Sequence, residues 1–134
     1  MSDEVAITQE QANMLTAGIQ PAIDSLLESG NFVPTLYVHD SEGMTFFSLV
    51  SRDAIELREI VRQVIRERMP PAIAYALLYD SSVETDEGPL DVLVVETGDT
   101  EDEEAHEFVK AYSRQRQWAA TGLARLGAAP HLLK

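Results

Sequence analysis

The sequence contains no cysteine. This excludes a disulfide framework, a thiolate metal site and a cysteine nucleophile, and the composition suits a reducing compartment. No charge-poor apolar run approaches the roughly 18 residues needed to cross a bilayer. The opening segment MSDEVAITQE is acidic, whereas a signal peptide would be basic and then apolar. These absences predict a cytoplasmic protein that does not bind membranes.

Basic residues are scarce. Ten lysines and arginines stand against 23 acidic residues, which gives a net charge of −13. A chain this negative disfavours phosphate-rich partners, so nucleic acid is not expected as a ligand. No lysine or arginine occurs from Met69 to Val109, whereas half of the bases lie on one short segment, at Arg52, Arg58, Arg62, Arg66 and Arg68.

The signatures of common enzymes are also missing. The sequence has no GxSxG elbow, no GxGxxG or GxxxxGK[ST] phosphate loop and no HExxH motif. The acidic run Asp99–Glu104 lacks the glycine and the distant glutamate of an EF-hand loop, so a solvated acidic loop explains it better than a calcium site. We therefore expect no cofactor and no metal, and the balance favours a protein that is not an enzyme.

The 134 residues, 45% of them hydrophobic, suffice for one well-formed core and predict a single domain over residues 1–134. A first helix is predicted over Thr8–Glu28, because Thr8 and Gln11 form a capping box ahead of apolar residues at helical spacing. Pro21 lacks a backbone N–H, which predicts a kink or break near Gly18–Gln20.

A first hairpin is predicted next. Phe32–His39 and Met44–Val50 have the length and residue types of strands, and a tight-turn composition separates them. A second helix is predicted from Arg52 to about Arg68, with Ser51 or Asp53 as its cap.

The stretch Ala72–Asp99 predicts the central hairpin, with strands Ala72–Tyr79 and Leu90–Glu96 joined by an acidic turn region. Both strands are apolar on both faces, so both faces of the sheet need a cover. Two helices are too little material for that, which predicts homodimerisation through sheet faces or sheet edges. Alternatively, the kinked halves of the first helix cover different faces.

The tail has two interpretations. One is a long C-terminal helix after a capping box at Thr100 and Glu103. The other is two more strands, Glu107–Ser113 and a weaker Trp118–Leu126. We favour strands, because a helix would have to carry Gly122 and would place part of the polar run 113–117 on its buried face.

These elements predict an α+β fold, with an antiparallel sheet of five to six strands and two helices in the order α-β-β-α-β-β-(β-β). The layout from about Asn31 to Glu96, with IAYALLYD and LDVLVVE after the second helix, resembles a set of small uncharacterised bacterial proteins of α-β-β-α-β-β order. The resemblance implies further strands in the tail and carries no activity.

Two groups of residues are candidates for a site. His39 and Asp40, at the end of a strand, are weak candidates for a general base or a metal ligand, although such a pair at a turn is more often turn chemistry. Arg58, Arg62 and Arg66, spaced four apart, form one stripe on the second helix that can receive an acidic partner or an anion.

The alternative for this stripe is a solvated face with local ion pairs, such as Arg52 with Glu56 and Glu59 with Arg62. In a third version, the stripe meets the acidic hairpin of the same copy or of a second copy.

The sequence supports two candidate functions. The first is a self-associating protein that acts through protein–protein contacts, with the acidic hairpin end or the arginine helix as its recognition surface. The second is a small-molecule-binding or metal-assisted hydrolytic domain. It would use His39, Asp40 and the carboxylates near residues 80–91, which are Asp80, Glu84, Asp86, Glu87 and Asp91.

Overall fold

The computed structural model of the chain describes residues 7–51 and 53–134. The acidic segment 1–6 and Arg52 lie outside these residues. The expected start of the second helix at Arg52, and the expected ion pair between Arg52 and Glu56, therefore lie outside them too.

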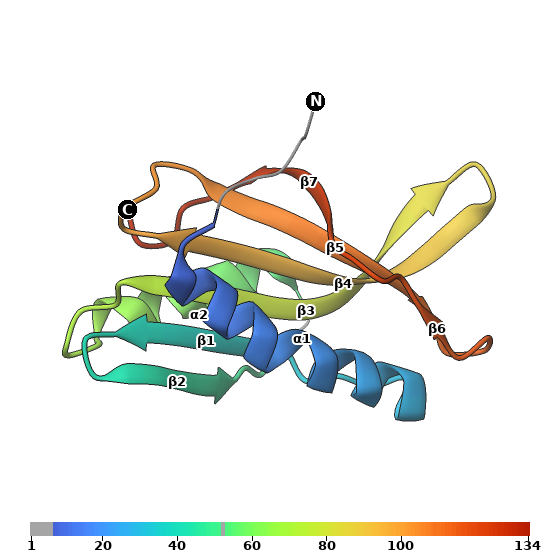
Figure 1. Cartoon of the computed structure of the whole chain (residues 1–134), viewed down its shortest axis with the longest axis horizontal. Coiled ribbons are helices and arrows are strands. Elements are labelled where there is room, and N and C mark those ends of the chain that lie inside the picture. The colour runs from blue at the N-terminus through green and yellow to red at the C-terminus, as the bar shows by residue number, and fades with distance from the viewer. Residues whose placement is uncertain (1–6, 52) are drawn as a thin grey trace.

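All strands of the described residues belong to one antiparallel sheet in the order β2-β1-β3-β4-β5, with both β6 and β7 paired to β5 (Figure 1). The predicted α+β class and the order helix, hairpin, helix, strands are confirmed. The strands are β1 (Thr35–Asp40), β2 (Gly43–Ser48), β3 (Ala74–Thr85), β4 (Gly88–Asp99), β5 (Ala105–Ser113), β6 (Trp118–Ala119) and β7 (Ala124–Ala129).

The first helix, α1 (Gln9–Ser29), begins with the predicted capping box, in which the Thr8 hydroxyl accepts from the Gln11 backbone and the Gln11 side chain accepts from the Thr8 backbone. Of the predicted kink or break near Gly18–Gln20, the break is wrong, because one helix runs through Pro21. Both halves of α1 bury apolar side chains against the same face of the sheet.

The second helix, α2 (Ala54–Arg66), is capped by Asp53, whose carboxylate accepts from the backbone N–H groups of Ile55 and Glu56. A carboxylate at this position also interacts favourably with the helix dipole. Of the two predicted caps, Asp53 is therefore the one in place.

The central hairpin is longer than predicted. Its strands pair without interruption as far as Thr85 opposite Gly88, so most of the acidic stretch that we assigned to a turn is strand. Most residues of this outer half are exposed, so it lacks the continuous apolar pattern by which strands are recognised. It projects as an arm from the body of the sheet (Figure 1).

The tail consists of strands, and the alternative of a C-terminal helix is wrong. Glu107–Ser113 lies within β5, and the polar residues that follow form a turn. The weaker predicted strand splits into β6 and β7, which are separated by a segment containing Gly122.

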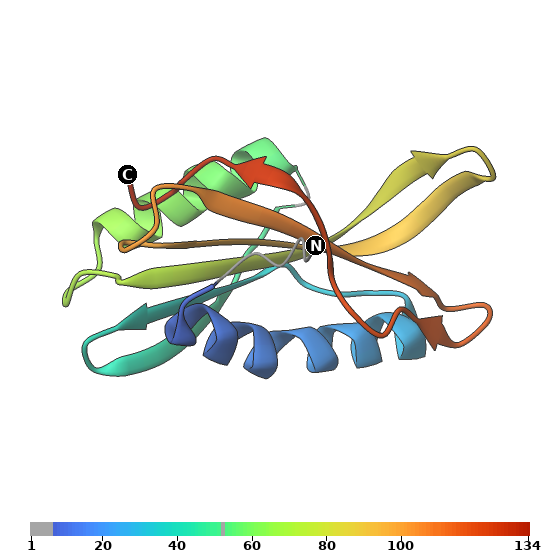
Figure 2. The same cartoon turned by 45° about the horizontal axis from the view of Figure 1, so that its top comes forward.

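Each face of the sheet has its own helix (Figure 2). Ala74, Ala76 and Leu78 of β3 pack with α1, whereas Tyr75, Leu77 and Tyr79 pack in a second cluster with α2 and Leu132. The expectation of an uncovered face is therefore wrong, and so is its alternative, in which two halves of α1 cover different faces. No helix within the described ranges is long and apolar enough to span a membrane.

Candidate functional site

The α2 face of the sheet contains a buried ion pair. Glu96 is fully buried, and its two carboxylate oxygens accept hydrogen bonds from Arg58 Nε at 2.9 Å and Arg58 Nη2 at 2.7 Å. The Tyr79 hydroxyl donates to Glu96 Oε2 at 2.6 Å. Burial, and then this contact with the carboxylate, raise the pKa of Tyr79 well above its usual value. Arg58, predicted as a binding residue, is thus held in a structural ion pair.

A second carboxylate lies beside this pair. Glu107 is directly opposite Glu96 in the β4–β5 ladder and is half-buried. Burial, and then the negative charge of Glu96, raise the pKa of Glu107, whereas Arg58 acts in the opposite direction. Arg58 therefore interacts with two acidic groups from neighbouring strands.

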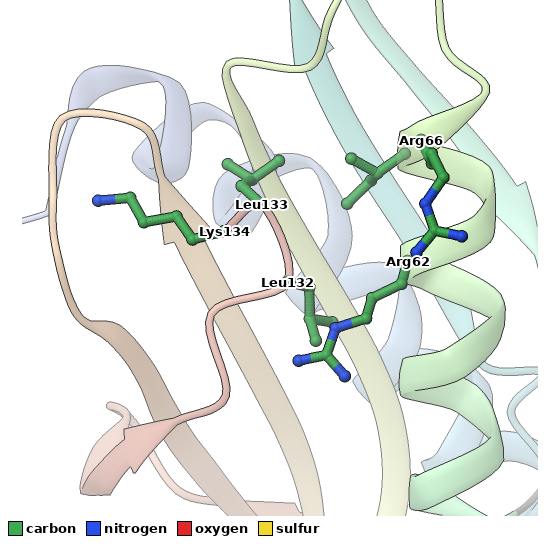
Figure 3. A pocket seen from close by; sticks show the side chains of 6 residues that line it. Arg62, Arg66, Leu132, Leu133 and Lys134 are labelled. Atoms are coloured by element: carbon green, nitrogen blue, oxygen red, sulfur yellow. The ribbon is translucent and has the colours of Figure 1, made fainter.

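Arg62 and Arg66, the other members of the predicted stripe, line a pocket of about 280 Å³ between α2 and the C-terminal segment. Figure 3 shows Leu132 and Leu133 facing the two arginines across the pocket, and the Lys134 side chain directed away from them. The predicted pair of Glu59 with Arg62 is absent from the ion pairs of the described residues. The stripe therefore divides into one arginine that is paired with a buried carboxylate and two that face a cavity.

The C-terminal wall of this pocket is held in place by buried hydrogen bonds. The Tyr75 hydroxyl donates to the Pro130 carbonyl at 3.2 Å and accepts from the Leu132 N–H at 3.1 Å. Burial raises the pKa of Tyr75 to about 12, so it remains a neutral donor. His131 Nε2 lies 3.0 Å from both the Asp99 and the Asp102 carbonyl oxygens.

His39 and Asp40 are the last two residues of β1, directly before the β1–β2 turn. The Asp40 carboxylate is buried and accepts from the Glu42 N–H at 2.8 Å and from Arg68 Nη2 at 2.7 Å. These two contacts, the Glu42 N–H first, lower the pKa of Asp40 below its usual 3.8. His39 Nδ1 lies 3.2 Å from the Asp40 carbonyl oxygen, not from its carboxylate.

The hairpin carboxylates lie at the other end of β3. His39 pairs with Ala74 at the start of β3, whereas Asp91 pairs with Ser82. Asp80, the nearest of these carboxylates, is six positions from Ala74, or about 20 Å at strand rise. The structure thus does not bring His39 and these carboxylates together, and no group of three or more metal-ligating side chains occurs among the residues that it describes.

A hydrogen-bonded group that we did not predict joins the acidic loop to β5 and β7. Asp99 is buried and accepts from the Thr8 hydroxyl at 2.6 Å. Asp102 pairs with His106 Nε2 at 3.0 Å, and this contact is the main reason that the pKa of Asp102 is lowered. Arg125 Nη2 lies 3.2 Å from His106 Nδ1. Each of these side chains has a hydrogen-bond partner, which indicates a structural role.

The free edge of β2 forms a second candidate surface. Only β1 pairs with β2 in the described sheet, and no strand lies beyond it (Figure 1). The strand GMTFFS carries no charge, and Phe46 is 65% exposed. Nine large hydrophobic side chains are exposed in the described ranges, and four of them lie on β2 or at the adjoining strand end, at Val33, Met44, Phe46 and Val50.

The outward backbone groups of β2 follow from its ladder. The Leu49 N–H donates to the Pro34 carbonyl at 2.8 Å, which continues the β1–β2 pairing. Because these bonds alternate along an antiparallel strand, Phe47 and Thr45 bond to β1, and the backbone groups of Phe46 point away from it. Phe46 thus combines an exposed aromatic ring with an outward N–H and C=O.

Comparisons of the chain with models of protein families, with curated proteins and with solved structures find no match.

Proposed function

We propose that this protein acts through protein–protein contacts in the cytoplasm and self-associates by pairing β2 antiparallel to β2 of a second copy. The observation that carries the proposal is the exposed, uncharged β2 edge with Phe46 at its middle. An exposed hydrophobic edge strand is a template for a further strand, and most proteins protect such an edge with charge, proline or a bulge.

A two-fold pairing of this strand is compatible with its residues. If Phe46 lies opposite Phe46 of the second copy, Met44 lies opposite Ser48, and the outward backbone groups bond reciprocally. The two Phe46 rings then face each other beside Tyr37, whose ring centroid is 5.8 Å from that of Phe46. Aromatic cross-strand pairs stabilise antiparallel sheets.

The contact is small. A single edge of six residues falls at the low end of specific interfaces, below about 1,200 Å² in total. We therefore expect reversible association with a dissociation constant on the order of micromolar or weaker.

The arginine helix and the acidic hairpin fit this role less well. The arm of the hairpin projects at the opposite end of the molecule from the C-terminal segment that borders Arg62 (Figure 1). A contact between these two surfaces would be heterologous, and it would form a ring or an open filament depending on the rotation between copies. Pairing of β2 closes after two copies.

The test is sedimentation velocity over a wide range of protein concentration. Phe46→Lys places two like charges opposite each other, so we expect it to weaken dimerisation by about tenfold or more. Leu126→Lys is the matched control, because Leu126 is 55% exposed on β7 and the change in charge is the same. A wild-type protein that stays monomeric, or equal weakening by both variants, would overturn the proposal.

A further inference from the structure

The pocket between α2 and the C-terminal segment is lined by arginines, although the molecule as a whole is acidic. In a chain of net charge −13, Arg62 and Arg66 lie one helical turn apart, and neither has an ion pair within the described residues. The nearby carboxylate of Glu67, at the C-cap of α2, accepts from the Gln63 side chain. Two neighbouring guanidinium groups repel each other, and a shared anion would relieve that repulsion.

Apart from Lys134, the rest of the pocket wall is apolar. Ile65 of α2 and Leu132 and Leu133 of the C-terminal segment line it, and Leu132 is almost fully buried (Figure 3). A simple inorganic anion would leave this wall without a partner. A molecule with a charged head and a short apolar chain would contact both parts of the pocket.

The pocket is also formed in advance. The Tyr75 hydroxyl and His131 hold the segment that carries Leu132, through the contacts described above. Arg58, one turn before Arg62, is fixed on Glu96 and anchors α2 to the sheet. Both walls therefore rest on buried or partly buried hydrogen bonds, so little ordering is required when a ligand binds.

We propose that this pocket binds a small organic anion, with a carboxylate or phosphate group on Arg62 and Arg66 and a short apolar chain against Leu132 and Leu133. A guanidinium fork matches both oxyanions in two-point geometry. The cavity of about 280 Å³ is at the lower limit of small-molecule sites, which restricts the apolar part to a short chain.

Methyl-resolved NMR titration tests the proposal with four probes, which are hexanoate, hexyl phosphate, hexan-1-ol and inorganic phosphate. We expect hexanoate or hexyl phosphate to shift the methyl signals of Leu132 and Leu133, and to bind about tenfold or more tightly than hexan-1-ol or inorganic phosphate. Whichever of the two binds more tightly identifies the preferred head group.

The double variant Arg62→Gln/Arg66→Gln should lower this affinity by about tenfold or more. The control Arg114→Gln/Arg116→Gln removes the same charge at the β5–β6 turn and should leave the affinity unchanged. Equal binding of hexan-1-ol would overturn the anion site, and equal binding of inorganic phosphate would overturn the apolar subsite. An equal loss of affinity in the control double variant would mean that general charge attraction explains the binding. This result would also overturn the proposal.

Discussion

The two edges of the sheet differ in how they meet solvent. At one edge, β2 is continuous and uncharged, and it exposes the large apolar side chains of Met44 and Phe46. At the other, the outer partner of β5 is divided into β6 and β7, and a bulge leaves Leu126 unpaired between Arg125 and Gly127. A broken, charged edge resists strand addition, whereas a continuous apolar edge permits it. The difference indicates which edge is available to a partner.

The largest effect on stability is expected at the ion pair between Arg58 and Glu96, which lies between the two edges of the sheet. Arg58→Met leaves the Glu96 carboxylate buried without its cation, which should lower the free energy of unfolding by about 3–5 kcal/mol. Arg62→Met on the same face of α2 is the control and should cost less than about 0.5 kcal/mol. Urea unfolding measures both, and equal costs would contradict a structural role for Arg58. Neither variant should change association of the folded protein, because neither residue lies at an edge.

Each edge is also anchored by an acidic residue with a lowered pKa. Asp40 holds the β1–β2 turn through Arg68, and Asp102 holds β5 through His106. A lowered pKa stabilises the folded state above the unfolded value near 3.8, and this contribution is lost as the pH falls through the folded value.

Asp40→Asn and Asp102→Asn should therefore each be less stable than the wild type at pH 7, and the deficit should shrink as the pH falls below 3.8. Only Asp40→Asn should also alter dimerisation, since its turn positions β2. Thermal unfolding at several pH values measures the stability deficit, and sedimentation velocity measures the change in dimerisation. A deficit that grows toward low pH would refute the assignment of these carboxylates.

The smallest expected effect is that of salt. Copies of net charge −13 repel each other, so screening should strengthen an uncharged β2 contact by a few fold between low and high ionic strength. A contact between the arginine stripe and the acidic hairpin would weaken instead. If sedimentation shows that association weakens as salt is added, the result would favour the contact between the arginine stripe and the acidic hairpin.

The sequence predicted those elements that depend on local patterns. The capping box at Thr8 and the two-sided apolar pattern of Ile73–Tyr79 are local signals, and the helix start and the buried central strand follow from them. The arm of the hairpin was missed because a strand whose residues are mostly exposed has the composition of a turn.

The candidate sites depended on contacts that are distant in sequence. Glu96 lies 38 positions from Arg58, and no local signal marks a glutamate in an apolar strand as its partner. Met44–Val50 was predicted as a strand, but its place at the sheet edge follows from strand order, which periodicity does not contain. The pocket required the C-terminal segment to cross the α2 face, and its hydrogen bond to Tyr75 spans 57 positions.

The most direct test of the β2 contact is residue-resolved amide hydrogen exchange of the wild-type protein at low and high concentration. The backbone N–H of Phe46 points away from β1, so in the monomer it hydrogen-bonds only to solvent and exchanges without protection. We predict that exchange at Phe46 slows as concentration rises, while exchange at Leu126 does not change. An exchange rate at Phe46 that is independent of concentration, while the protein demonstrably dimerises, would contradict pairing through β2.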